Sequence, residues 1–597
     1  MRSVPRSNEL ERILALPRRG EQGIEDLVDP LSKFLARPDH VCRPPGTNGP
    51  NDRGCAGGAT RLNHFQVQGL VEFHDYNRLW VQGPLGVGKT ALSFLCFTIS
   101  EAKRPLLVIP GGGRTKTMDE LKVLREHWRV PPFQLVSYQK ISRTSGEFFF
   151  IEPPGPYDVV IFDEVHYCSN EDAAVTRRFQ RFRDARGAFV NVNELRVFVP
   201  ATVKVGVMTA TPAKDSITDF YHTMEWTADE MSPLPRNDSD ISDWAGALDA
   251  NPAERIAPGV LTQFSGGSDT LEHVRRGVAK RIFETPGFIS SSETFCDAKL
   301  TITLRNIPLT PEEDHWYRHL RGDPDNTEEF PGWVTPDGEI FMEPADLWRH
   351  ACSLALGYTT YWDPPAPPEW RKARYEWHHG ARELISESQT YDTFQHVANA
   401  VDDGKFPHLK DALEAWREIQ PTFEPNSVPR WVGDTALRYA QSWFSDPGIV
   451  WTQHIHFGRE LAKRTGYPFF EEGGWTQDRS DHIHRTTKDR IIASVAANSA
   501  QYNLQRFNRN LLSSIWPTGR TVEQCIGRTH RQGQKRDVIV DWAISCAEQQ
   551  AGFTRAATMH SPFYTQILQM PSRLSYGEIR SETITQTGWA FRTQQKK

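Results

Sequence analysis

Residues 79–97 read LWVQ (79–82), GPLGVGKT (83–90) and ALSFLCF (91–97). The first part predicts a short apolar strand and the last part a helix, so a glycine-rich segment joins strand to helix. The spacing GxxxxGK[ST] is typical of a phosphate-binding loop, because glycines let backbone N–H groups converge on phosphate oxygens at a helix N-terminus. We predict that a nucleotide is held by Gly83, Pro84, Leu85, Gly86, Val87, Gly88, Lys89 and Thr90.

A second apolar run, YDVVIFDEVH (157–166), ends in two adjacent carboxylates. An acidic pair after a strand is common in solvated turns, but its position downstream of a phosphate loop favours an active site. Lys89 would then reach the β- and γ-phosphates, and Thr90 and Asp163 would ligate Mg²⁺. Glu164 would polarise the attacking water. The catalytic residues predicted for this half are Lys89, Asp163 and Glu164.

The order of further motifs resembles that of superfamily 2 helicases, whose second motif is DExH. LNHFQVQG (62–69) is similar to the family's adenine-reading element, which implies that Gln66 contacts the base. PLLVIP (105–110) and QLVSY (134–138) stand where the family has two DNA-facing strand ends, although GGGR (111–114) replaces the usual Lys-Ser-Leu type of sequence. VGVMTATP (205–212) resembles the turn that couples the nucleotide site to the nucleic-acid groove.

The second half of the site is predicted from QCIGRTHRQGQK (524–535), which follows a strand candidate at GIVWTQ (448–453). In superfamily 2, QxxGRxxR supplies arginines that cross an interlobe cleft to the γ-phosphate. The resemblance therefore implies catalytic roles for Gln524, Arg528 and Arg531. The extension RxGQ is similar to the Swi/Snf-type translocases in particular. ANSAQYNLQ (497–505) keeps that family's Asn-Leu-Gln ending without its usual glycines.

This resemblance implies an α/β fold with two RecA-like parallel-sheet lobes and helical insertions. It also implies ATP and Mg²⁺ as cofactors and a DNA-stimulated ATPase that tracks along double-stranded DNA with little sequence preference. Two alternatives remain open. One is a strand-separating helicase or the motor subunit of a restriction or repair complex. The other is a nucleotide-gated scaffold that does not hydrolyse ATP.

Motif positions divide the chain into six segments. The N-terminal segment, whose patches ELERILAL and IEDLVDPLSKFL could pack on lobe one or dock a partner, ends near residue 60. The aromatic residues of the insertion are expected to serve in its core or in interlobe packing rather than as base-stacking platforms. A protein partner could bind through 226–445. The predicted segments are 1–60 (helical and linker), 61–225 (lobe one), 226–300 (helical protrusion), 301–445 (bridge and insertion), 446–550 (lobe two) and 551–597 (tail).

Composition excludes some classes of partner and location. The formal net charge of −6 gives no global argument for nucleic-acid binding, so any DNA contact must be local. The chain has no run of about 18 apolar residues and its N-terminus is polar, so we expect no membrane contact and no secretion. We expect an intracellular protein, cytoplasmic or, in a eukaryotic or viral host, nuclear.

The eight cysteines include no CxxC pair, so we expect scattered reduced thiols. Cys42 and Cys55 flank a loop rich in Gly, Pro and Asn, with His40 nearby. Their spacing matches no ligand pattern, and we predict no metal site there.

Overall fold

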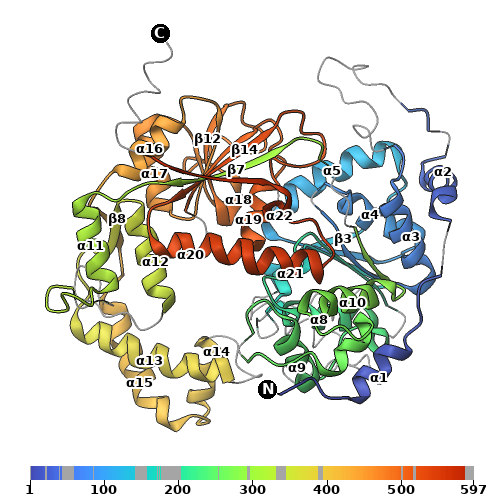
Figure 1. The fold of residues 1–597 in the computed structure, drawn as a ribbon, viewed down its shortest axis with the longest axis horizontal. Coiled ribbons are helices and arrows are strands. Elements are labelled where there is room, and N and C mark those ends of the chain that lie inside the picture. The colour runs from blue at the N-terminus through green and yellow to red at the C-terminus, as the bar shows by residue number, and fades with distance from the viewer. Residues whose placement is uncertain are drawn as a thin grey trace.

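The strand before the phosphate loop lies inside a six-stranded, entirely parallel sheet, whose order is β3-β2-β4-β5-β1-β6 (Figure 1). β5 separates the phosphate-loop strand from the strand of the acidic pair. Every residue of β2 is buried, as expected for a parallel strand covered by helices on both faces. The strands are β1 (Arg78–Gln82), β2 (Pro105–Ile109), β3 (Gln134–Ser137), β4 (Val159–Asp163), β5 (Lys204–Thr209) and β6 (Phe288–Ser290).

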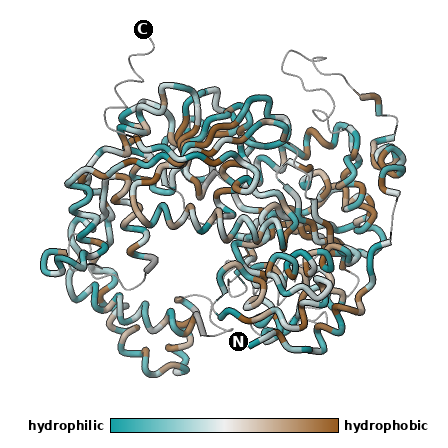
Figure 2. Tube along the Cα trace, viewed as in Figure 1, coloured by the Kyte–Doolittle hydropathy of each residue, from teal (hydrophilic) through white to brown (hydrophobic). Residues whose placement is uncertain are grey.

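A second parallel sheet has seven strands in the order β11-β12-β10-β13-β14-β7-β15. The two sheets confirm the predicted α/β fold of two parallel-sheet lobes, and hydrophobic residues gather along many of their strands (Figure 2). The strands of lobe two are β7 (Leu300–Asn306), β10 (Gly448–Thr452), β11 (Phe469–Phe470), β12 (Arg490–Ser494), β13 (Arg509–Ser514), β14 (Val538–Ile544) and β15 (Glu578–Thr583).

Helices surround both sheets in this computed structural model. The helices are α1 (Asn8–Ala15), α2 (Ile24–Leu35), α3 (His64–Tyr76), α4 (Lys89–Ile99), α5 (Arg114–His127), α6 (Tyr138–Ile141), α8 (Tyr221–Ala228), α9 (Asp238–Leu248), α10 (Leu271–Glu284), α11 (Pro311–Arg321), α12 (Pro344–Ala355), α13 (Pro368–Glu387), α14 (Phe394–Asp402), α15 (Lys410–Ile419), α16 (Thr435–Trp443), α17 (Ile455–Thr465), α18 (Val495–Asn498), α19 (Gly519–Ile526), α20 (Ala547–Arg555), α21 (Ser561–Gln566) and α22 (Arg573–Tyr576). The structure describes residues 2–20, 23–38, 40–42, 60–84, 86–141, 157–170, 173, 175–176, 203–252, 254–291, 296–330, 332, 344–387, 394–498, 502–514 and 519–584.

Both lobes extend beyond the boundaries expected from the motifs. β6, from the predicted protrusion, pairs with β1, and β7, from the predicted bridge, pairs with β14. α9 and α10 share a buried apolar cluster with the lobe-one sheet, through Trp244, Val274 and Ile282. α1 and α2 also pack on lobe one, since Leu10 and Val28 are buried in its two clusters. Of the two expectations for the N-terminal helices, the structure therefore has the packed one.

The insertion between β7 and β10 forms a separate helical group with its own core. α13, α14 and α15 pack around the buried Trp370, Trp377 and Trp416, which are at most 7% exposed. Trp370 and Trp416 meet edge to face with ring centroids 5.1 Å apart. The prediction that these aromatics serve as core is confirmed for the three tryptophans. A two-stranded antiparallel ribbon, β8 (Tyr358–Trp362) with β9 (Ser427–Trp431), connects this group to lobe two.

The predicted C-terminal tail crosses from one lobe to the other (Figure 1). α21 lies on lobe one, where the Tyr564 hydroxyl donates to Ala213 O at 2.9 Å and Gln82 and Ser290 donate to Leu568 O. The chain then returns to lobe two, where β15 pairs with β7. Residues 551–584 therefore tie the two lobes together.

No helix in the described part of the chain is both long enough and apolar enough to cross a membrane.

Candidate active site between the lobes

The phosphate loop curves around the side chain of its own lysine. Gly86 and Gly88 have φ of 99° and 93°, which residues with a Cβ rarely adopt, so the glycine spacing is required by the backbone. Lys89 is buried and donates from Nζ to Gly83 O at 2.7 Å and Pro84 O at 3.1 Å. Gly88 caps α4, of which Lys89 and Thr90 are the first residues. Leu85, also predicted in the loop, lies outside the described residues.

α3 is attached to this loop by its first turn. Asn63 is the N-cap of α3 and donates from Nδ2 to Val87 O at 3.0 Å. Gln66 closes the capping box, accepting from Asn63 N at 3.0 Å, and donates from Nε2 to Gly88 O at 3.1 Å. The predicted adenine-reading glutamine thus lies against the phosphate loop, and its contact with a base stays a prediction.

The two carboxylates stand at the C-terminal end of β4, beside the phosphate loop. Asp163 ends the strand, and Glu164 has the left-handed φ of 56° that turns the chain into the 3₁₀ helix Val165–Cys168. Burial raises the pKa of Asp163 to about 7, and the charge of Glu164 adds to the rise. Burial alone would also raise the pKa of Glu164. It is nevertheless lowered to about 2, by His166, whose Nδ1 lies 3.2 Å from Glu164 Oε2, and by Lys89 and Arg528.

Tyr138, at one of the two strand ends expected to face DNA, points into lobe one, and the expected DNA contact of this strand end stays a prediction. Tyr138 is 2% exposed, stacks on Tyr167 with ring centroids 5.5 Å apart, and donates its hydroxyl to Asp163 O at 2.9 Å. This hydrogen bond holds the backbone of the acidic pair in place. The next residue, Gln139, accepts from Gly111 N at 2.7 Å, so the ends of β3 and β2 are joined.

Lobe two places its arginines against the phosphate loop. Arg528 is 2% exposed and donates from Nε to Gln524 O at 3.1 Å, while its Nη2 is buried without a hydrogen-bond partner among the described residues. A Cβ placed on Gly86 would lie 3.5 Å from both Nε and Nη2 of Arg531. Residues predicted as one site from motifs in different halves of the chain are therefore brought together.

Direct hydrogen bonds also link the two lobes. Gln524 Nε2 donates to Thr211 Oγ1 at 3.0 Å and lies 3.5 Å from His166 Nε2. Thr211 belongs to the TATP turn after β5, which the resemblance assigned to coupling. Arg520, one turn before Gln524 on α19, donates to Ser169 Oγ at 3.4 Å. Arg520 was not predicted, although its spacing of four from Gln524 places the two side chains on one helix face.

The RxGQ extension holds the arginine segment to the preceding loop. Gln534 Nε2 donates to the carbonyls of Gln505 and Phe507, both at 2.9 Å, and to Thr529 O at 3.1 Å. Leu504 N donates to Arg528 O at 3.0 Å. The Asn-Leu-Gln ending therefore contacts the arginine motif even though the usual glycines are missing.

The site holds cationic side chains that suit a phosphate group and oxygen ligands that suit a divalent cation. Burial lowers the pKa of Lys89 to about 8 and that of Arg528 to about 9, so both remain largely protonated at neutral pH. The unpartnered Nη2 of Arg528 fits a further acceptor, such as a phosphate oxygen. Thr90 and the carboxylate of Asp163 supply the hard oxygen ligands that Mg²⁺ prefers. The residues present thus fit a nucleoside triphosphate and Mg²⁺.

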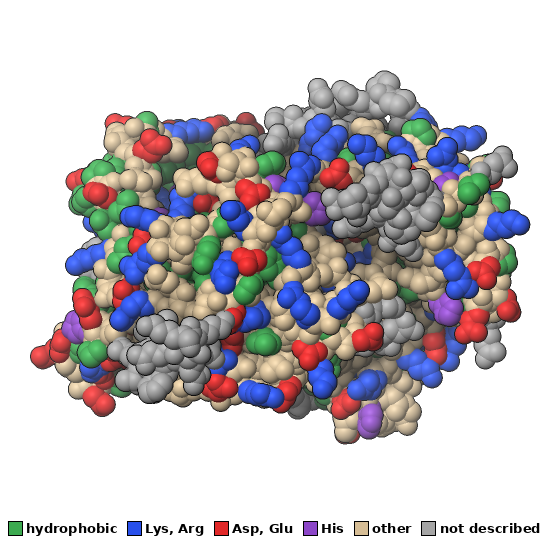
Figure 3. Space-filling model, turned by 90° about the horizontal axis from the view of Figure 1, so that it is seen from above, with side chains coloured by type: hydrophobic (Ala, Val, Ile, Leu, Met, Phe, Trp, Pro, Cys, Tyr) green, Lys and Arg blue, Asp and Glu red, His purple; other side chains and the backbone are tan. Residues whose placement is uncertain are grey.

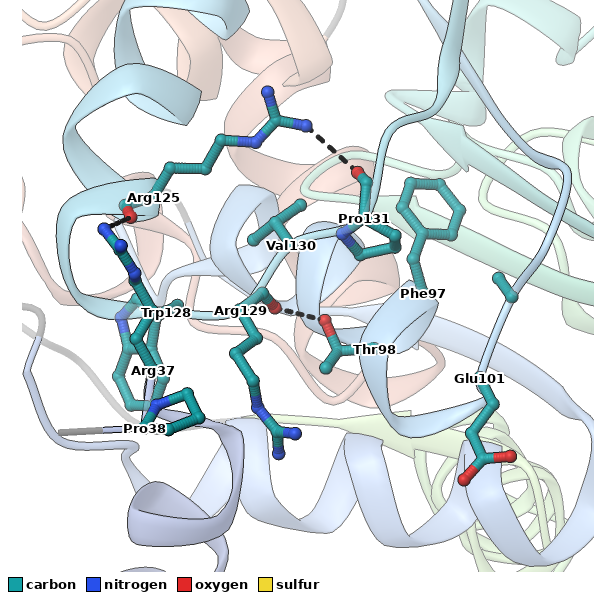
Figure 4. Close-up of a pocket in the computed structure, with 11 residues that line it drawn as sticks. Arg37, Pro38, Phe97, Thr98, Glu101, Arg125, Trp128, Arg129, Val130 and Pro131 are labelled. Carbon is teal, nitrogen blue, oxygen red and sulfur yellow. Dashed lines mark hydrogen bonds between the residues drawn. The ribbon is translucent and has the colours of Figure 1, made fainter. Parts of the chain in front are cut away.

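A cavity of about 600 Å³ lies at the opposite end of α4 from the phosphate loop (Figure 4). Its lining includes Phe97 and Thr98 near the end of that helix and Trp128 and Arg129 after α5. Since α4 has 11 residues, its two ends are roughly 16 Å apart. This cavity is therefore separate from the candidate active site.

The outer surface gives no broad basic area in the view of Figure 3, where the described Lys and Arg side chains are interspersed with Asp and Glu. This agrees with the net charge of −6.

A scan against protein-family models finds no match to this chain, and a search of the curated proteins finds none either.

Proposed function

We propose that the chain is an ATPase whose catalytic site is built across two lobes and that it uses ATP to move along double-stranded DNA. The observation that carries the ATPase half is the approach of Arg531 and Arg528 of lobe two to the phosphate loop and acidic pair of lobe one. Such an arrangement would couple the state of the nucleotide to closure of the cleft. The DNA half rests on the resemblance of the ordered motifs to the Swi/Snf-type translocases.

Each residue then has a defined part in the reaction. Lys89 would neutralise the β- and γ-phosphates, and Thr90 with Asp163 would hold Mg²⁺, which when bound polarises the phosphoryl oxygens. Glu164, kept ionised by its neighbours, would accept a hydrogen bond from the attacking water.

The lobe-two residues would complete the site only when the cleft is closed. Arg528 and Arg531 would stabilise the charge that develops on the γ-phosphate. The hydrogen bond from Gln524 to Thr211 would couple closure of the two lobes to the position of the turn after β5. Hydrolysis and release would remove the anion that the arginines share with Lys89, and the lobes would part.

The nucleic-acid specificity is tested by measuring ATP hydrolysis with blunt duplex DNA, single-stranded DNA and RNA. We expect the greatest stimulation by duplex, with an affinity that falls steeply as salt rises because phosphate contacts supply the binding. The protein should displace a third strand from a triplex and leave a forked duplex paired.

Three other results would each replace part of the proposal. Unwinding of the fork without triplex displacement would favour the strand-separating helicase. Stimulation by RNA alone would overturn the family resemblance. Hydrolysis that is indifferent to every nucleic acid would overturn the DNA half, and the absence of hydrolysis under all conditions would leave the nucleotide-gated scaffold.

A further inference from the structure

Two histidines and a cysteine meet on lobe one, two of them neighbours in the sequence and the third 85 residues beyond Cys42. His40 and Cys42 follow α2, and His127 is the last residue of α5. Cys42 Sγ lies 3.4 Å from His127 Nδ1, and the His40 and His127 rings stand edge to face with centroids 4.7 Å apart. One nitrogen or sulfur atom from each residue lies within 4.8 Å of the other two.

Backbone pairing brings these three side chains together. Ala36 forms an antiparallel bridge with Trp128, Arg37 N donates to His127 O at 2.9 Å, and Arg129 N donates to Leu35 O at 3.0 Å. A turn follows, in which His40 N donates to Arg37 O at 3.2 Å. Backbone hydrogen bonds that do not involve the cluster therefore hold the segment leading to His40 beside His127.

The distances suit a tetrahedral transition-metal ion. With bonds of about 2.0–2.1 Å to histidine nitrogen and about 2.3 Å to cysteine sulfur, ligand atoms in a tetrahedral site lie roughly 3.3–3.8 Å apart. The 3.4 Å between Cys42 and His127 falls within that range. The three candidate ligand atoms lie within 4.8 Å of one another, so any pair of them must approach by no more than about 1.5 Å to reach tetrahedral spacing. Imidazole and thiolate together favour Zn²⁺ over Mg²⁺ or Ca²⁺.

We propose that lobe one binds Zn²⁺ through His40, Cys42 and His127, with the fourth position taken by water or another ligand. The site is distinct from the phosphate loop. It lies beside the cavity of Figure 4, whose lining includes Arg37 and Trp128 from the same backbone pairing. Its role is structural: the ion fastens the segment after α2 to the end of α5. Zinc binding would thus stabilise the docking of the N-terminal helices on lobe one, independently of nucleotide.

The test is the metal content of the full chain, purified without a polyhistidine tag after growth in zinc-supplemented medium. We expect about one zinc per chain after dialysis against metal-free buffer. Cys42→Ser and His127→Asn should each lose most of it. Cys296→Ser, which removes a thiol outside the cluster, should keep it.

Cobalt replacement provides a second readout, in which the deciding measurement is made on the wild type. Wild type stripped by a chelator and loaded with Co²⁺ should show a thiolate-to-cobalt charge-transfer band, and Cys296→Ser should show it too. A wild type that holds well under half an equivalent of zinc and gives no such band would overturn the proposal. Zinc retained by both Cys42→Ser and His127→Asn, with their circular dichroism unchanged, would place the metal elsewhere and equally overturn it.

Discussion

The hydrogen bond from Gln524 to Thr211 joins the two lobes and can be removed with little change of side-chain shape. Thr211→Val deletes only the acceptor hydroxyl, and Gln524→Leu deletes the donor. Thr211 and Gln524 are buried, at 2% and 8% exposure. Each single change therefore leaves the polar group of the other residue buried without this hydrogen bond. The net value of such a neutral bond is about 1 kcal/mol, and an unsatisfied partner costs about 1–3 kcal/mol.

Because the bond joins the lobes, its loss should act on the closed state and therefore on kcat/KM for ATP. We expect each single variant to lower kcat/KM by roughly five- to 150-fold, as about 1–3 kcal/mol implies. The double variant should be less impaired than the product of the two effects, with a coupling of about 1 kcal/mol.

The matched control combines Gln524→Leu with Thr565→Val, a threonine whose hydroxyl bonds only carbonyls of its own helix among the described residues. That pair should be additive to within about 0.3–0.5 kcal/mol. Additivity of the Thr211 and Gln524 effects to the same margin would refute the argument that this contact operates during turnover.

Three further predictions concern the rest of the molecule. Lys89→Ala should abolish turnover, and Glu164→Gln should leave ATP bound but unhydrolysed in a filter-binding assay; near-normal steady-state rates in either would overturn their roles. Mg²⁺-dependent nucleotide binding should weaken as pH falls below about 7, approaching tenfold per unit, because Asp163, whose pKa burial raises to about 7, takes up a proton and cannot ligate the ion; titration calorimetry with a parallel series in EDTA checks this, and equal pH profiles in the two series would contradict it. Arg573→Ala should destabilise lobe two by about 3–5 kcal/mol in urea unfolding, since it leaves the buried carboxylate of Glu523, 2.8 Å away, without its ion-pair partner; a loss below about 1 kcal/mol would show that the pair is dispensable.

The parts of the site that local sequence encodes were predictable. A phosphate loop needs its glycines at fixed offsets, and Gly86 and Gly88 have the positive φ that such a loop requires. The two parallel sheets were implied by the resemblance of the ordered motifs to superfamily 2 helicases rather than by any local pattern. The meeting of the two halves could be expected only from the resemblance, since no local pattern states that Arg531 approaches Gly86.

Features that depend on pairing between residues distant in the chain could not be predicted from the sequence. β15 is exposed at every residue, so it has no apolar run to identify it as a strand, yet it pairs along its length with β7. The predicted tail became an interlobe tie because Arg573 bonds Glu523 and Leu568 O accepts from lobe one. Likewise, the spacing of Cys42 and His40 matched no ligand pattern, because the third member of the cluster, His127, is 85 residues away from Cys42.

The central claim is that one catalytic site is shared by the two lobes, and Arg528→Ala tests it most directly. The variant keeps the whole phosphate loop and acidic pair of lobe one, so nucleotide affinity, measured with a fluorescent ATP analogue, should change by only a few-fold. ATP turnover under saturating nucleotide should fall by on the order of a hundredfold or more, because the charge-stabilising group from lobe two is gone. Loss of nucleotide binding with unchanged turnover per bound nucleotide would contradict the account and reassign Arg528 to a structural role.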